Sequence, residues 1–150
     1  MICDIWHSNI AEMDETFSEN PKRILVVDDS EDNLYLMQFV LEAQGYKVEL
    51  SSSGKQALDW AKHYHPDLIL LDLMMPQMNG DEVIEQLRSD KATSAIPVFL
   101  VTANKCFGWT EAKTIGANGV IYKPVDFDRL MFQVTKILSE AKSTKSSANH

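Results

Sequence analysis

The chain has 150 residues, enough for one domain of ordinary size and too few for two. Hydrophobic residues make up 45% and charged residues 24%, which fits a globular protein and excludes a disordered, collagen-like or disulfide-rich chain. The 22 acidic against 14 basic residues give a net charge of −8 without a basic cluster, which argues against direct binding to nucleic acid or an anionic membrane.

The two cysteines and the hydropathy pattern indicate a cellular compartment. Cys3 and Cys106 lie far apart, with neither a CxxC pair nor the Cys/His spacing of zinc ligands, so no disulfide framework and no zinc site are predicted. No apolar run reaches the roughly 20 residues that span a bilayer, and the N-terminus lacks the pattern of an export signal. We therefore expect a cytoplasmic protein.

Residues 1–21 precede the first predicted strand, and two interpretations of this extension stay open. Apolar residues at near-helical spacing favour an amphipathic helix that packs on the domain or binds a partner. These residues are Ile2, Ile5, Trp6, Ile10, Met13 and Phe17. The alternative is a frayed extension, or an upstream start codon with Met13 as the working start.

Over residues 22–141, apolar runs alternate with segments of helical periodicity, which is the pattern of β/α units around a parallel sheet. The predicted strands are 23–27, 46–50, 67–71, 96–101 and 119–122. The first three helices carry apolar faces of Leu34, Met37 and Leu41, then Ala57, Leu58 and Ala61, then Val83, Ile84 and Leu87. Ser30 and Gly45 are the expected N-cap and C-terminal glycine of the first helix.

The remaining helical predictions differ in strength. A helix over 105–115 is weakly patterned, because Gly108 interrupts it. The last helix has Asp126 as its N-cap and one apolar face made of Leu130, Val134, Ile137 and Leu138. The polar residues 142–150 are predicted to form a disordered tail.

Polar side chains stand where four of the predicted strands end. Asp28 and Asp29 follow the first strand, Asp72 the third, Thr102 the fourth and Lys123 the fifth. The carboxyl ends of parallel strands share one edge, and right-handed crossovers in the order 2-1-3-4-5 place the first and third strands side by side. The five side chains are therefore predicted to meet in one site.

The chemistry of this set favours a metal and a phosphoryl group. Three close carboxylates repel one another unless a proton or a cation lies among them, so Mg²⁺ is expected, with Mn²⁺ as a substitute. A carboxylate can accept a phosphoryl group, whose charge Lys123 and Thr102 would help to stabilise. Each residue alone has an ordinary explanation as a cap, a strand residue or a surface charge, but their coincidence at four strand ends favours a site.

Four motifs in chain order resemble the receiver domain of bacterial two-component response regulators. They are VVDDS at 26–30, LLDLMMPQMNG at 70–80, VTA at 101–103 and YKP at 122–124, and the resemblance covers about residues 22–139. Within the family, the chain resembles single-domain members such as chemotaxis regulators. The resemblance implies a flavodoxin-like α/β fold, with a doubly wound five-stranded parallel sheet in the order 2-1-3-4-5 and five helices.

The resemblance also implies a metal site and a phosphoacceptor. Asp72 would accept the phosphoryl group, Asp29 would bind Mg²⁺ directly, Asp28 would act mostly through metal-bound water, and the backbone carbonyl of Met74 would complete the protein ligands. Such a chain is not an enzyme on other substrates, and has at most self-catalysed phosphotransfer and autodephosphorylation. By the same resemblance, Met74 and Asn104 would flank the phosphoryl group. Because a thioether orients water poorly, we expect the phosphorylated state to decay without unusual speed.

The residues expected to switch conformation match the family except at one position. Lys123 and Thr102 would contact the phosphoryl oxygens, and Pro124 would follow the lysine through a cis peptide. Where relatives carry an inward-turning aromatic residue, this chain has Val120. Tyr122 should lie on the same face of the strand, which leaves a relocated switch and simple packing at the sheet edge as alternatives.

The expected partners are a histidine kinase or phosphotransfer protein and a downstream protein target, with a homodimer as an open alternative. No output domain is expected after the last helix. The kinase is expected to contact the first helix near Tyr35, Gln38 and Phe39. The target is expected near Phe107, Trp109 and Tyr122, although packing of Trp109 in the core is an alternative.

Two other functions compete with phosphoryl relay. A receiver fold that binds partners without phosphorylation is one, and the departure at Val120 supports it. A phosphohydrolase of the haloacid dehalogenase type is the other, but such enzymes carry Asp-x-Asp, whereas Met74 stands two residues after Asp72. The chain also lacks a Gly-rich phosphate loop that ends in Lys-Ser or Lys-Thr.

Overall fold

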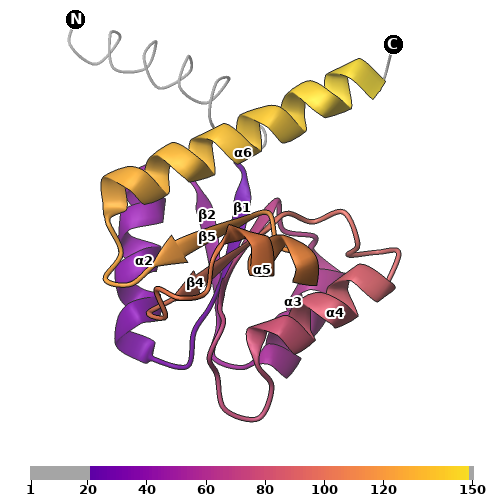
Figure 1. Ribbon diagram of the computed structural model, residues 1–150. Coiled ribbons are helices and arrows are strands. Elements are labelled where there is room, and N and C mark those ends of the chain that lie inside the picture. The colour runs from indigo at the N-terminus through magenta and orange to yellow at the C-terminus, as the bar shows by residue number, and fades with distance from the viewer. Residues whose placement is uncertain (1–20, 149–150) are drawn as a thin grey trace, which may run out of the picture.

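The computed structural model describes the backbone of residues 21–148 and the side chains of residues 21–140. It shows one parallel sheet between two layers of helices (Figure 1). The predicted N-terminal helix and Cys3 lie outside the described residues, so both interpretations of the extension remain predictions. Among the described helices, none combines the length and the apolar character needed to cross a bilayer.

The sheet has five parallel strands in the order β2-β1-β3-β4-β5, which confirms the predicted topology. The strands are β1 (Arg23–Val27), β2 (Lys47–Ser51), β3 (Leu68–Asp72), β4 (Val98–Thr102) and β5 (Gly119–Tyr122). β2 and β3 begin one residue later than predicted, and β4 begins two residues later. The later start of β4 follows Pro97, which has no N–H group to donate to a ladder.

Five helices connect and cover the strands. They are α2 (Glu31–Ala43), α3 (Gly54–Tyr64), α4 (Gly80–Ser89), α5 (Trp109–Ile115) and α6 (Phe127–Ala148). The predicted caps are confirmed: the Ser30 hydroxyl accepts from the amide of Asn33, and Asp126 Oδ1 accepts from the first amides of α6. Gly45 follows α2 with a φ of +94°, the left-handed conformation that favours glycine.

Two predicted helix ends are wrong. α5 begins at Trp109 and not at residue 105, because the Asn104 side chain accepts from the amide of Cys106 in a turn, and Gly108 is the extended N-cap. α6 continues to Ala148, so the polar stretch 142–150, predicted as a disordered tail, is helical up to that residue. A helix that has already formed continues without an apolar stripe, because each added residue contributes one backbone hydrogen bond.

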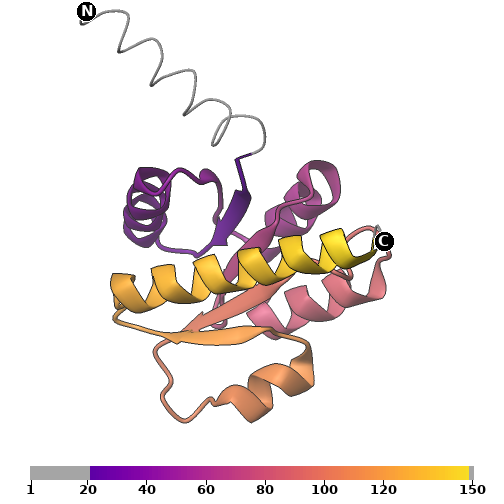
Figure 2. The same ribbon diagram turned by 90° about the horizontal axis from the view of Figure 1, so that it is seen from above.

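Two apolar cores lie on opposite faces of the sheet, between the strands and the helices that Figure 2 shows on either side of them. Alternate residues of the central strands point to each face, so Leu25 and Val27 of β1 pack with α3, α4 and α5, while Ile24 and Val26 pack with α2 and α6. β1, β3 and β4 are buried almost throughout. The sheet therefore holds its strand ends rigidly, and these ends position the site.

Candidate functional site

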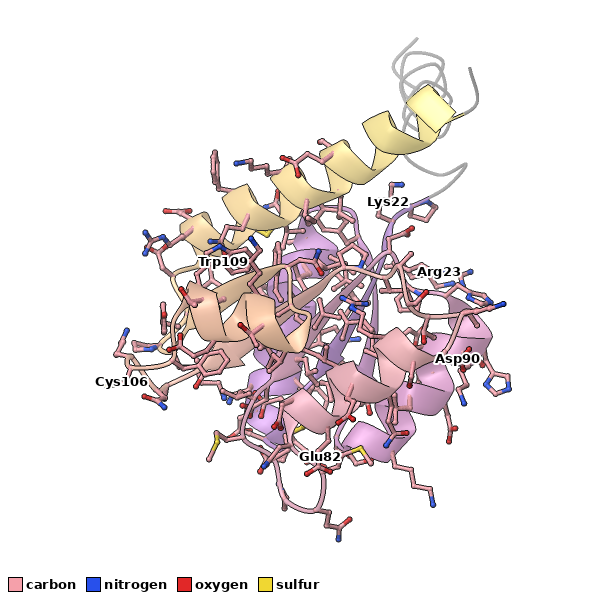
Figure 3. The ribbon with its side chains drawn as sticks, turned by 45° about the vertical axis from the view of Figure 1, so that its right-hand side comes forward. Lys22, Arg23, Glu82, Asp90, Cys106 and Trp109 are labelled. Atoms are coloured by element: carbon pink, nitrogen blue, oxygen red, sulfur yellow. The ribbon has the colours of Figure 1, made fainter. Side chains whose placement is uncertain are left out.

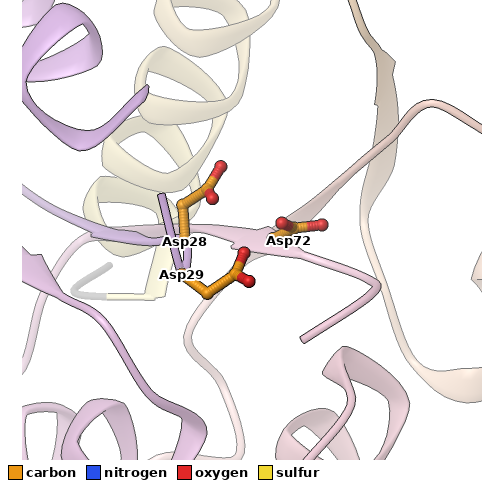
Figure 4. Close-up of side chains that lie close together, drawn as sticks. All are labelled: Asp28, Asp29 and Asp72. Carbon is orange, nitrogen blue, oxygen red and sulfur yellow. The ribbon is translucent and has the colours of Figure 1, made fainter. Parts of the chain in front are cut away.

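Three carboxylates lie together at the carboxyl edge of the sheet (Figure 4). Asp72 is the last residue of β3, and Asp28 and Asp29 follow the neighbouring strand β1. One carboxylate oxygen of each residue lies within 4.8 Å of the others. Asp28 and Asp72 are buried and Asp29 is exposed, so the cluster is open to solvent at Asp29.

Backbone amides hold the two buried carboxylates in place. Asp28 Oδ1 accepts from the amide of Ser30 at 2.9 Å, and its Oδ2 accepts from the side-chain amide of Asn33 at 3.3 Å. Asp72 Oδ1 accepts from the amide of Met74 at 3.1 Å. These bonds occupy part of each carboxylate and leave the other lone pairs directed at the cluster.

Lys123 lies against both buried carboxylates. Its Nζ is 3.2 Å from Oδ2 of Asp28 and 3.2 Å from Oδ2 of Asp72. A cis peptide joins it to Pro124, as predicted, and its amide donates to the carbonyl of Thr102 at 2.8 Å. One ammonium against three carboxylates leaves two negative charges, which matches the charge of a divalent cation.

Burial and the neighbouring charges shift two pKa values in this cluster. Burial raises the pKa of Asp72, and Asp28 adds to this rise, which outweighs the opposing hydrogen bond from Met74 and the charge of Lys123. Burial alone would lower the pKa of Lys123, but the carboxylates of Asp72 and Asp28 raise it. The lysine therefore stays protonated, while the ionised form of Asp72 is disfavoured.

Thr102 makes its hydrogen bond away from the cluster. It is buried at the end of β4, and its hydroxyl accepts from the amide of Asn104 at 3.0 Å. The structure therefore brings Asp28, Asp29, Asp72 and Lys123 together, and places Thr102 at the next strand end with its hydroxyl bonded to the following loop.

Two contributors to the site were missed in the sequence. A Cβ at Gly80 would lie 2.8 Å from the carbonyl oxygen of Asp72 and 2.9 Å from the Cα of Leu73, so only glycine lets α4 begin this close to the site. Its place at the end of the motif at 70–80 was a usable signal. Asn33, which bonds Asp28, gave no such signal, because it is an ordinary polar residue of α2.

The region around β5 resolves one alternative. Val120 is half-buried against the core under α3, α4 and α5, and the Tyr122 hydroxyl donates to the carbonyl of Phe107 at 2.6 Å. Lys105 Nζ lies 5.2 Å from the centre of the Tyr122 ring. Trp109 is 51% exposed at the start of α5 (Figure 3), so the alternative in which it packs in the core is wrong.

The surface of α2 presents large hydrophobic side chains. Tyr35 and Phe39 are 57% and 74% exposed, whereas Gln38 is half-buried and donates to Glu42 at 3.1 Å. Leu36, which the sequence did not single out, is 49% exposed and lines an apolar groove that reaches Lys123. The acidic site and this surface are therefore adjacent.

Comparison with known proteins decides the family. Residues 24–135 match the response regulator receiver domain. The chain belongs to this family. The polar-differentiation response regulator DivK of Brucella ovis is 36% identical to this receiver domain over 121 residues, which cover 80% of this chain and 98% of DivK. The match assigns the chain to the receiver family and not to the phosphohydrolases of the haloacid dehalogenase type.

Solved structures agree with this receiver fold. The chemotaxis protein CheY4 of Vibrio cholerae superposes with a TM-score of 0.73 at 27% identity, and covers 79% of this chain and 99% of its own. The receiver domain of the sensor histidine kinase PA1611 of Pseudomonas aeruginosa was solved with a magnesium ion coordinated in its active site cleft. It superposes with a TM-score of 0.74 at 26% identity, and the match covers 80% of this chain and 99% of that domain. Receiver domains bind Mg²⁺ at an acidic pocket, and the three carboxylates here fit that chemistry.

Proposed function

We propose that this chain is a single-domain response regulator that accepts a phosphoryl group on Asp72 and passes the signal on by protein contact. The donor is a phosphohistidine of a histidine kinase or phosphotransfer protein, and the transfer requires Mg²⁺. One observation carries the proposal: the oxygens of Asp28, Asp29 and Asp72 lie within 4.8 Å, and Lys123 contacts two of these carboxylates.

The chain's own oxygen atoms suit a hard divalent cation. Asp29 and Asp72 would hold Mg²⁺ directly, with the backbone carbonyl of Met74 as a third ligand and Asp28 acting through water. When bound, the metal supplies positive charge beside the phosphoryl oxygens. The net charge of −2 in the cluster supports a divalent rather than a monovalent ion.

The transfer itself balances with the groups present. A carboxylate oxygen of Asp72 attacks phosphorus, and the bond between phosphorus and the donor's imidazole nitrogen breaks. The electron pair stays on that nitrogen, which takes up a proton. Lys123 Nζ, already 3.2 Å from Asp72 Oδ2, then donates to a phosphoryl oxygen, and the Thr102 hydroxyl turns from the amide of Asn104 to donate to another.

Two surfaces support the proposed contacts with proteins. The donor docks at α2, where Tyr35 and Phe39 are exposed and Leu36 lines the groove that reaches Lys123. The downstream target docks around β5 and the start of α5, where Trp109 is exposed and Tyr122 holds the preceding loop. Residues 22–141 form the receiver unit in this proposal, and the protein acts in the cytoplasm.

Acetyl phosphate and intact-mass spectrometry test the proposal. With Mg²⁺ the wild type is expected to gain one phosphoryl group, and Asp72→Asn none. Asp81→Asn, the same change at an exposed aspartate of α4, is the matched control and should gain it normally. If the wild type gains no phosphoryl group, or Asp72→Asn gains it equally, the proposal fails and a binding module that works without phosphorylation is preferred.

A further inference from the structure

A shallow groove runs along the side of α6 that does not pack on the sheet. The helix buries Leu130, Val134 and Leu138, whereas other positions line the groove. These are Asp128, Met131, Phe132, Thr135, Lys136 and Ser139. Phe132 is 69% exposed. In Figures 1 and 2 no other described element covers the side of α6 that is turned away from the sheet. Among the described residues of α6, Phe132 is the only large hydrophobic side chain that is exposed, and it stands between Asp128 and Lys136 in the lining of the groove.

We propose that this groove binds a second copy of the chain, with the two α6 helices antiparallel around a twofold axis at Phe132. Asp128 stands one turn before Phe132 and Lys136 one turn after it, and both are exposed. In an antiparallel pair, Asp128 of each copy faces the partner subunit's Lys136, so both ends of the contact carry opposite charges. In a parallel pair, like charges would face each other at both ends.

Other features of α6 agree with this arrangement. Opposed helix dipoles favour antiparallel packing, and the small side chains of Thr135 and Ser139 permit close approach. Each copy contributes only one large exposed hydrophobic side chain to the groove, so the dimer is weak and depends on concentration. The groove shares no residue with the acidic site, so the dimer does not depend on the proposed function.

Charge reversal tests the proposal directly. Sedimentation velocity of the full chain over a range of concentrations, without phosphodonor, is expected to show a monomer–dimer equilibrium. Asp128→Lys makes both ends of the groove positive and Lys136→Asp makes both ends negative, so each variant alone should dimerise roughly tenfold more weakly. An equimolar mixture of the two variants should restore association, because every substituted position then faces an opposite charge.

Matched controls separate this contact from general charge effects. Asp81→Lys in the first turn of α4 and Lys113→Asp in the last turn of α5 make the same changes outside the groove and should leave the equilibrium unchanged. Phe132→Ser should abolish the dimer. Because all the substituted side chains are exposed, each variant should keep the circular dichroism spectrum of the wild type. A mixture that associates no better than either variant alone overturns the proposal. So does a wild type that stays monomeric, as expected if residues 1–20 or another protein cover the groove.

Discussion

Charged side chains have opposite surroundings at the two edges of the sheet. At the amino edge, the Arg88 guanidinium donates from Nε and Nη2 to the carbonyl of Gly116 at 3.1 and 2.9 Å, and from Nη1 to that of Ile96 at 2.8 Å. At the carboxyl edge, Asp28 and Asp72 share one ammonium while Asp29 lies beside them. The first edge satisfies its charge with neutral acceptors, and the second keeps an excess of negative charge.

The difference shows which edge serves stability and which serves binding. Burial lowers the pKa of Arg88, but its hydrogen bonds join α4 to the loops before β4 and β5. Asn118 adds to the same network, since its Oδ1 accepts from Arg88 and from the amide of Val98. A half-buried polar network with its partners in place stabilises the fold, whereas a cluster of like charges needs a proton or a cation to relieve its repulsion.

Lys123→Met should have the largest effect, because it removes the only ammonium that contacts the acidic cluster among the described residues. The rate of phosphoryl transfer from acetyl phosphate should fall on the order of 100-fold, since the developing charge loses one donor. Time-resolved intact mass at fixed Mg²⁺ measures this rate. Lys113→Met, at an exposed position of α5, is the control, and equal rates in the two variants would count against the role of Lys123.

Arg88→Met should destabilise the fold and leave phosphoryl transfer unchanged. The carbonyls of Gly116 and Ile96 and the side chain of Asn118 lose a charged donor, which costs about 2 to 4 kcal/mol in the free energy of unfolding. Urea titration measures the loss, and Arg129→Met at an exposed site of α6 is the control. A loss below that of the control would show that the amino edge is not held by this network.

Met74→Asn should shorten the lifetime of the phosphorylated state several-fold. Met74 is 67% exposed beside Asp72, and an amide in its place can orient water that a thioether cannot. Loss of the added phosphoryl mass after removal of the donor gives the decay rate. Met74→Leu keeps the side chain apolar and should decay like the wild type. An unchanged rate in Met74→Asn would refute the expectation.

Asp72→Asn should raise the melting temperature by about 2 to 5 °C when Mg²⁺ is absent. The raised pKa means that the folded chain binds this proton more tightly than the unfolded chain, so ionised Asp72 costs stability. That cost grows as pH rises from the ordinary value of 3.8 through the raised pKa, and is constant above it. The gain in melting temperature should therefore shrink on acidification, and scanning calorimetry from acidic to neutral pH measures it. A gain that grows on acidification would contradict the prediction.

Much of the carboxyl edge could be predicted from the sequence, because the residues change from apolar to polar where these strands end. This change predicts that Asp28, Asp72 and Lys123 lie together, and the structure shows Lys123 in contact with both carboxylates. The amino edge could not be predicted in this way. Arg88 bonds mainly to backbone carbonyls, which every residue has, so no sequence pattern distinguishes it from a surface arginine of α4.

Local conformation accounts for the other differences. The start of α5 depended on whether the Asn104 side chain would cap a turn, which competes with helix over the same residues. The exposure of Trp109 follows from that later start, because it becomes the first residue of a short helix at the surface. The hydroxyl of Thr102 takes the amide of Asn104 as its partner, a choice that strand position alone did not specify.

The stability of the protein against Mg²⁺ concentration tests most directly whether the charge excess at the carboxyl edge is compensated by a metal. The wild-type melting temperature should rise with Mg²⁺ at constant ionic strength, as ligand linkage requires. The rise should be much smaller in Asp29→Asn, and Asp81→Asn should behave like the wild type. Equal rises in the wild type and Asp29→Asn, or no rise in the wild type, would contradict the metal site.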